Sequence, residues 1–152
     1  MNPIAQLLTE SNVVVDVEVD SKPALFERIG ALFERNAGLS RNVVSTSLAA
    51  REKLGSTGLG QGIAIPHGRI KGLAKATGAF LRLKTPIPFD APDGKPVGQL
   101  FVLLVPEQAT EEHLQLLSEL AQMFSDRPFR DKLASAATGG DLVRLFQAWE
   151  AS

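Results

Sequence analysis

Four apolar runs predict β-strands along the chain. Residues 13–19 are rich in valine, and residues 76–84 hold a second apolar run, as expected of strands. Residues 97–105 are apolar at nearly every position, which is typical of a central strand covered on both faces. The shortest run, residues 63–65, predicts a brief buried strand. Residues 85–96 hold four of the nine prolines and therefore predict a loop.

Apolar positions at helical spacing predict two helices after the first strand. Ser21 and Ser40 are residue types that favour the N-cap, and Gly38 is a favourable stop between the two helices. The second helix should run to about Lys53, so Arg51 lies in its last turn. The side chains expected to face the core are Leu25, Ile29, Leu32 and Phe33 in the first helix, and Val43, Val44, Leu48 and Ala49 in the second.

Three more helices are predicted after the central strand. One begins near residue 110, another begins near Pro128, and Asp141 is expected to cap the last one. The inner stripe expected for the helix near residue 110 is Leu114, Leu117, Ala121 and Phe124. Strands and helices are mixed in order, and a strand buried on both faces requires helices on both sides of the sheet. We therefore predict a three-layer α/β/α sandwich around a mixed β-sheet.

Length and composition set further bounds. A chain of 152 residues is expected to form one domain, residues 1–152. The formal charge of −1 gives no overall attraction to nucleic acid or to an anionic membrane surface. No apolar run reaches the length of a membrane span, and the first twelve residues lack the pattern of a signal peptide, so a cytoplasmic location is expected. Without cysteine there is no disulfide, thiolate nucleophile or cysteine-ligated zinc site.

A glycine-rich stretch, residues 55–69, carries the candidate chemistry. His67 stands between Pro66, which fixes its own φ, and Gly68, which permits close approach of another backbone or a ligand. A neutral imidazole nitrogen can attack phosphorus, and the transferring phosphoryl group needs positioning and charge stabilisation. The residues expected to supply that stabilisation are Arg51, Gly55, Ser56, Thr57, Gly58 and Arg69. No lysine completes a Walker-type loop, so a nucleotide site is not predicted.

Each of these residues also has a plain structural interpretation. His67 can be a loop histidine that is satisfied by the backbone, and His113 shares a helix face with positions 117, 120 and 124, as a core histidine would. Arg51 can be a solvated cation at a helix C-terminus, and Arg69 can point to solvent. The two histidines lack the spacing of a zinc site, and no Gly-x-Ser-x-Gly elbow supports a serine hydrolase.

The chain also resembles a known family. The matching residues are Arg51 and Glu52, residues 55–58, Gly60, residues 62–69, Pro106 and Glu107, and His113 and Leu114. They are similar to the fructose/mannitol-type enzyme IIA domains of the phosphotransferase system, above all the nitrogen-related branch. The resemblance implies that His67 accepts a phosphoryl group at Nε2 from an HPr-like phosphocarrier protein, without a cofactor. It also implies that His113 orients and stabilises that group rather than carrying it.

The residues leave three possible functions open. The first is a regulatory protein whose phosphorylation state selects its targets, for which potassium-transport regulators and sensor kinases are examples seen in the family. The second is a sugar-specific enzyme IIA that passes phosphate to a separate IIB component. The third is a binding module that keeps the fold but is never phosphorylated.

Overall fold

The strands form one mixed sheet. The computed structural model of the chain describes residues 2–108 and 110–150, and within them the sheet has six strands. Their order is β1-β5-β6-β3-β2, and β4 also pairs with β6. The strands are β1 (Val13–Val17), β2 (Gly58–Gly60), β3 (Ile63–Ala64), β4 (His67–Ile70), β5 (Thr77–Ile87) and β6 (Val97–Pro106). β5 and β6 are antiparallel, whereas β1 is parallel to β5, and both β3 and β4 are parallel to β6.

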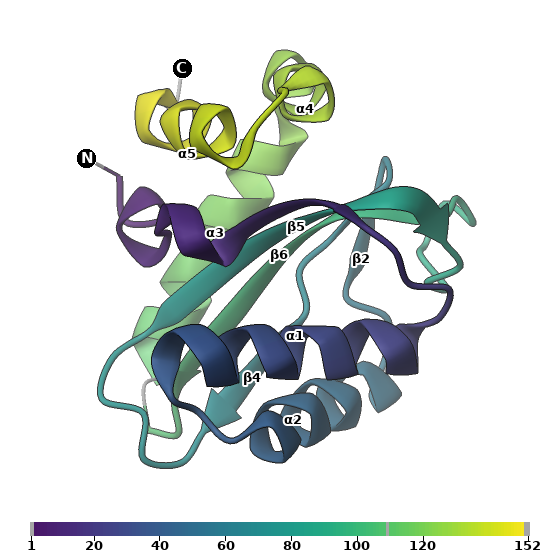
Figure 1. Ribbon diagram of the computed structural model, residues 1–152. Coiled ribbons are helices and arrows are strands. Elements are labelled where there is room, and N and C mark those ends of the chain that lie inside the picture. The colour runs from purple at the N-terminus through teal and green to yellow at the C-terminus, as the bar shows by residue number, and fades with distance from the viewer. Residues whose placement is uncertain (1, 109, 151–152) are drawn as a thin grey trace.

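Helices cover both faces of the sheet, which confirms the predicted three-layer sandwich (Figure 1). One face carries α1 (Lys22–Ala37) and α2 (Arg41–Lys53), and the other carries α3, α4 and α5. The last three are Thr110–Ser125, Arg127–Ser135 and Gly139–Ala148, and the 3-10 turns η1 and η2 are Ala5–Leu7 and Glu10–Asn12.

The two cores alternate along the central strand. Leu100, Val102 and Leu104 of β6 belong to the core beneath α1 and α2. Their neighbours Phe101 and Leu103 belong to the core beneath α3, α4 and α5. All of these side chains are fully buried, because successive residues of a strand point to opposite faces. The apolar run in residues 97–105 therefore serves two cores at once, as predicted.

Most predicted helix boundaries are confirmed. The Ser21 and Ser40 hydroxyls accept hydrogen bonds from the N–H groups of Ala24 and Val43, and Gly38 ends α1 at a φ of 68°. The predicted cap at Asp141 is wrong, because Thr138 accepts the Asp141 N–H at 3.1 Å. The two glycines after Thr138 form the first turn of α5 instead of preceding the helix.

Helix phase was predicted less well. In α2, Val44 and Leu48 are buried, but Val43 and Ala49 are exposed. In α3 the predicted stripe is wrong at Leu114, which is 65% exposed, and at the exposed Ala121, whereas Phe124 is buried and Leu117 is partly buried. The side chains that α3 buries fully or nearly so are Leu116, Leu120, Met123 and Phe124. Apolar residues occur on more than one side of this helix, so spacing alone did not identify the side that packs.

The sheet also has more strand than predicted. β5 continues through Pro86 to Ile87, into the segment expected to be a loop. β4 was not predicted at all, although it contains His67. β3 and β4 follow β6 in one register, with Ile63 opposite Gln99 and His67 opposite Leu103, so the strand direction is kept across the Pro66 interruption. This arrangement places His67 at the start of a strand on the edge of the sheet.

Candidate functional site

The imidazole of His67 is fixed through both ring nitrogens. Nδ1 lies 2.8 Å from the carbonyl oxygen of Ile65, which can only accept, so Nδ1 carries the proton in the neutral ring. Nε2 lies 3.2 Å from Nε of Arg51, which can only donate. Both contacts require the same tautomer, which leaves the lone pair on Nε2. His67 as a residue is only 9% exposed, so its ring is largely buried.

Arg51 reaches the imidazole from the last turn of α2. Its Nη1 donates to the carbonyl oxygen of Gly55 at 2.9 Å, while its Nε donates to His67. Helix α2 can lie this close to β4 because residue 68 is glycine: a Cβ there would overlap the Ser47 hydroxyl. The sequence therefore builds the contact between Arg51 and His67 partly by omitting a side chain next to the histidine.

His113 reaches the same imidazole from α3, on the opposite side of the sheet. The two ring centroids are 5.1 Å apart, and the ring planes meet at 66° in an edge-on arrangement. Nε2 of His113 is buried and finds no hydrogen-bond partner among the described residues. A buried polar atom without a partner is costly, and this atom lies beside a candidate nucleophile, so a bound ligand can supply the missing bond.

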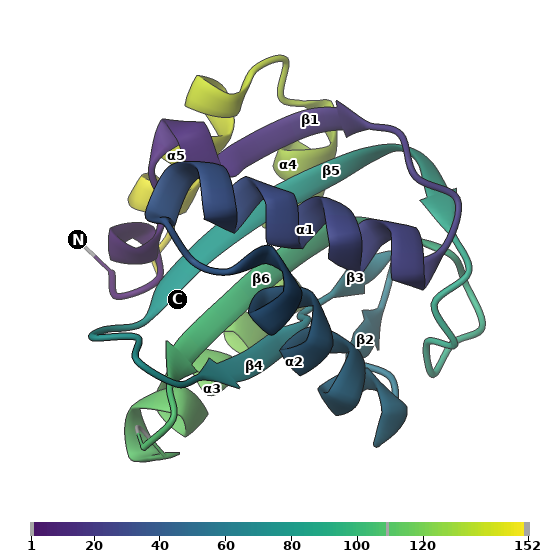
Figure 2. The ribbon, with the colours of Figure 1, turned by 60° about the horizontal axis from the view of Figure 1, so that its bottom comes forward.

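These side chains surround one open hollow of about 350 Å³ at the edge of the sheet. Figure 2 shows α2 on one side of β4 and α3 on the other. The lining combines titratable residues with small or apolar ones: Arg51, His67, Arg69 and His113, with Ser47, Ala50, Leu54 and Gly68. Leu54 is 84% exposed, so the rim offers apolar surface as well as positive charge. Of the sequence-predicted residues, the structure brings together His67, His113, Arg51 and Arg69.

Both histidines favour the neutral form. Burial lowers the pKa of His67 below its ordinary 6.5, and the Arg51 charge lowers it further. The hydrogen bond to Ile65 and the Glu52 charge oppose that shift. Burial also lowers the pKa of His113, with contributions from His67, Arg69 and Arg51. At neutral pH His67 is therefore a neutral imidazole, the form in which histidine is nucleophilic, and its Nε2 lone pair accepts the hydrogen bond from Arg51.

The lowered pKa values predict that the protein becomes less stable in mild acid. Below pH 6.5 the unfolded chain binds protons at histidines that are still neutral in the folded protein. The free energy of unfolding should therefore fall as pH drops below 6.5, until the lowered pKa values are passed. Urea unfolding from pH 7.5 to 5.0 measures this, and the double variant His67→Gln, His113→Gln should show a shallower decline. Parallel declines in the two proteins would contradict the prediction.

The predicted phosphate-binding loop makes contacts of another kind. The Ser56 hydroxyl donates to the Phe89 carbonyl at 2.7 Å, and the Thr57 hydroxyl and N–H donate to the Glu52 carboxylate. The Gly55 N–H bonds to the Glu52 carbonyl, and the Gly58 N–H bonds to the Ser56 hydroxyl. None of these four residues lines the hollow at His67. Phosphate contact by this loop stays a prediction, and its observed contacts fit a positioning role.

Sequence reasoning assigned no role to Glu52. Its side chain is 6% exposed and accepts bonds from Thr57 and from Nζ of Lys22. The available signal was its place beside Arg51 within the stretch that carries the family resemblance. The partners of Glu52 lie far apart in the sequence, so its burial could not be predicted from spacing.

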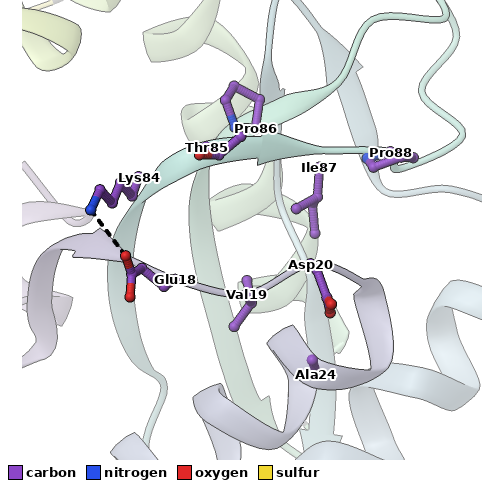
Figure 3. Close-up of a pocket in the computed structure, with 9 residues that line it drawn as sticks. All are labelled: Glu18, Val19, Asp20, Ala24, Lys84, Thr85, Pro86, Ile87 and Pro88. Atoms are coloured by element: carbon purple, nitrogen blue, oxygen red, sulfur yellow. Dashed lines mark hydrogen bonds and ion pairs between the residues drawn. The ribbon is translucent and has the colours of Figure 1, made fainter.

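A larger hollow, of about 650 Å³, lies elsewhere, where β1 leads into α1 beside the far end of β5. Figure 3 shows its ion pair between Lys84 and Glu18, with Nζ and Oε1 3.0 Å apart, together with apolar side chains such as Ile87. It contains none of the predicted site residues. The chemistry therefore points to the smaller hollow at His67.

Over residues 2–108 and 110–150, no group of three or more His, Asp or Glu side chains could hold a metal ion. None of the helices in this described part is both long and apolar enough to cross a membrane.

Comparisons with known proteins identify relatives along most of the chain. Residues 6–149 match the family model described as "Phosphoenolpyruvate-dependent sugar phosphotransferase system, EIIA 2". A nitrogen regulatory protein of Pseudomonas aeruginosa is 46% identical over 143 residues, which cover 93% of each chain. A fructose-specific EIIA component of Haloferax volcanii is 42% identical over 96 residues, or 63% of this chain and 62% of that protein. The crystal structure of nitrogen regulatory protein IIA-Ntr from Neisseria meningitidis matches with a TM-score of 0.89 and 52% identity, covering 95% of this chain and 99% of that one.

Proposed function

Because the chain belongs to the EIIA 2 family of the phosphoenolpyruvate-dependent sugar phosphotransferase system, we propose that it accepts a phosphoryl group on Nε2 of His67 from an HPr-like phosphocarrier protein. The observation that carries the proposal is the fixed tautomer of His67. Ile65 holds the proton on Nδ1, so the lone pair faces Arg51 and the hollow rather than the protein interior.

In the proposed step, a bond forms between Nε2 and phosphorus as the bond between phosphorus and the donor breaks. The Nε–H of Arg51 leaves the nitrogen lone pair and donates instead to a phosphoryl oxygen, where it meets a larger negative charge. The proton on Nδ1 stays against the Ile65 carbonyl, which stabilises the positive charge that the ring gains on binding phosphorus. Onward transfer reverses these movements.

Three cationic or polar groups are available to the charge spread over the phosphoryl oxygens. Arg51 already touches the nucleophile, and Arg69 lines the same hollow. The unpartnered Nε2 of His113 is the third, and a phosphoryl oxygen would give it the bond it lacks. A loose phosphoryl transition state depends mostly on such positioning and charge stabilisation, so no metal or cofactor is needed in the proposal.

His113→Ala is therefore expected to slow phosphoryl transfer by about tenfold without abolishing it, since one of several stabilising groups is lost. Rapid-quench measurement of transfer from the phosphorylated carrier gives the rate. Gln122→Ala, an exposed change on the same helix, is the control and should keep the wild-type rate. An unchanged rate in His113→Ala would make His113 a packing residue only.

We infer a regulatory output in the cytoplasm, in which the phosphorylated and free forms bind different target proteins. Support comes from the nitrogen regulatory relatives, which match 93% of the chain or more in the best cases. Phosphorylation adds about two negative charges beside a hollow that now carries two arginines, which is enough to change its preference between acidic and basic partners. Potassium-transport regulators and sensor kinases are the proposed kinds of target.

A sugar-specific role is the second candidate, supported by the fructose-specific relative. These 152 residues contain no cysteine, so in this role a thiol acceptor of the phosphate would lie outside them, in a IIB component. Adding a fructose-type IIB domain to the phosphorylated protein separates the two outputs. Rapid loss of phosphate to IIB favours the sugar-specific role, and retention favours the regulatory one.

The direct test is intact-protein mass spectrometry after incubation with phosphoenolpyruvate, enzyme I and the phosphocarrier protein. The proposal requires a gain of one phosphoryl group that depends on all three components. If the folded wild-type protein gains none, it is a binding module that keeps the fold without the chemistry.

A further inference from the structure

The Glu52 carboxylate is a buried charge near the site that forms no hydrogen bond to His67. Nζ of Lys22 lies 2.9 Å from one of its oxygens, and the Thr57 hydroxyl lies 2.6 Å from the other. The Thr57 N–H lies 3.2 Å from both oxygens. Charge-assisted hydrogen bonds of this kind are strong and directional, so they fix the position of Thr57 relative to α2.

From Thr57, a chain of hydrogen bonds leads to Nδ1, the inner nitrogen of the His67 imidazole. The Thr57 carbonyl accepts the N–H of Ile65 at 3.0 Å. The Ile65 carbonyl in turn accepts the Nδ1–H of His67 at 2.8 Å. A shift of Thr57 therefore moves the group that selects the His67 tautomer and aims its lone pair.

A second chain of hydrogen bonds leads to Nε2, the outer nitrogen of the His67 ring. Glu52 is adjacent to Arg51, and its backbone carbonyl accepts the Gly55 N–H at 3.1 Å. The Gly55 carbonyl holds Nη1 of Arg51, whose Nε meets Nε2 of His67. The bond to Gly55 uses the backbone of residue 52, whereas the Glu52 carboxylate holds Thr57, two residues further along the loop whose Gly55 carbonyl holds the guanidinium.

We propose that Glu52, anchored by Lys22 and Thr57, is a positioning residue that sets both the tautomer of His67 and the placement of Arg51. The proposal rests on the proposed phosphoryl transfer for its kinetic consequence, but its effect on the imidazole is independent of that function. Lys22 completes the anchor because it lies over the Phe89 ring, 4.6 Å from the centroid, and also pairs with Asp90 at 3.2 Å. The anchor therefore joins the start of α1, the end of α2 and the loop before β6.

The test uses Glu52→Gln, which keeps the size of the side chain but removes its charge. Glu34→Gln is the matched control, because Glu34 forms an ion pair with Arg41 at 3.3 Å on the exposed surface. Transfer from the phosphorylated carrier should fall by about ten- to a hundredfold in Glu52→Gln, since small misplacement of catalytic groups has effects of that size. Glu34→Gln should keep the wild-type rate.

The nitrogen-15 spectrum of the His67 ring is the second readout. In the wild type it should show a protonated Nδ1 and a bare Nε2, whereas in Glu52→Gln the two signals should move toward each other as both tautomers populate. A role in stability alone would leave this pattern unchanged in the folded protein. Thr57→Val keeps the ion pair between Lys22 and Glu52 and should shift the nitrogen-15 pattern in the same direction. It replaces Glu52→Gln in this test if Glu52→Gln fails to fold.

The outcomes separate the two proposals. Wild-type transfer and an unchanged spectrum in the folded Glu52→Gln or Thr57→Val protein overturn the role of Glu52. If the wild-type protein accepts no phosphate, the proposed function fails, and the nitrogen-15 spectra alone decide whether Glu52 positions the imidazole.

Discussion

His67→Gln is expected to accept no phosphoryl group from the carrier protein, the largest effect of any single change in this chain. Glutamine can replace the hydrogen bonds of imidazole, but its amide nitrogen has no free lone pair with which to attack phosphorus. His67 is also where the Ile65, Arg51 and His113 contacts converge. Intact-protein mass spectrometry after full incubation should show one phosphoryl group on the wild type and none on the variant.

His113→Gln is the matched control for this experiment, because it changes the other histidine in the same way. It should still reach full phosphorylation, although more slowly. Phosphate on His67→Gln would mean that another residue carries it, and phosphate missing only from His113→Gln would reverse the assignment of the two histidines. Circular dichroism of each variant establishes that the fold is kept.

Arg51→Ala is expected to show the second largest loss, about a hundredfold or more in the rate of transfer, as for other groups that stabilise charge in a transition state. Arg51 contacts Nε2 of His67 and is also tied to the Gly55 carbonyl, so its guanidinium is held in place without a bound donor. Arg69 lines the same hollow, but its side chain is on an exposed residue. Arg69→Ala should therefore slow transfer less, by about tenfold or below.

Single-turnover kinetics with the phosphorylated carrier compare the two arginine variants under one condition. Arg41→Ala, in the first turn of the same helix, controls for the loss of a surface cation. A larger loss in Arg69→Ala than in Arg51→Ala would contradict the assigned roles. Arg51→Lys should recover little of the rate, because an ammonium group cannot reproduce the two bonds of the guanidinium fork.

The sequence predicted the layers of this protein well, because they follow from local rules. An apolar run such as residues 97–105 needs cover on both faces, and serines and glycines at helix ends act through their immediate neighbours. Asp141 was misassigned because Thr138 three residues earlier offered an equally good cap. Errors at helix boundaries of this kind arise where two nearby residues are equally suitable N-caps, so local rules cannot choose between them.

The interior of the site was harder to predict. The sequence identified His67, His113, Arg51 and Arg69, and the structure places them around one hollow. It did not indicate that the donors of the glycine-rich loop are already bonded within the protein, because the acceptors include the carbonyl of Phe89, more than thirty positions away. The exposed Leu114 shows the same limit, since a helix with apolar residues on several sides does not reveal which side packs.

The hydrogen bond from Arg51 to Nε2 of His67 should lower the nucleophilicity of the imidazole at rest. Because the Nε2 lone pair already accepts this hydrogen bond, we expect the ring to bind metal cations and to react with alkylating reagents less readily than a free imidazole. In the proposed transfer, the negative oxygens of the incoming phosphoryl group would draw the guanidinium away and free Nε2 in the same movement. If the proposal holds, the imidazole reacts only with a suitable phosphoryl donor, so the open hollow needs no lid to protect it.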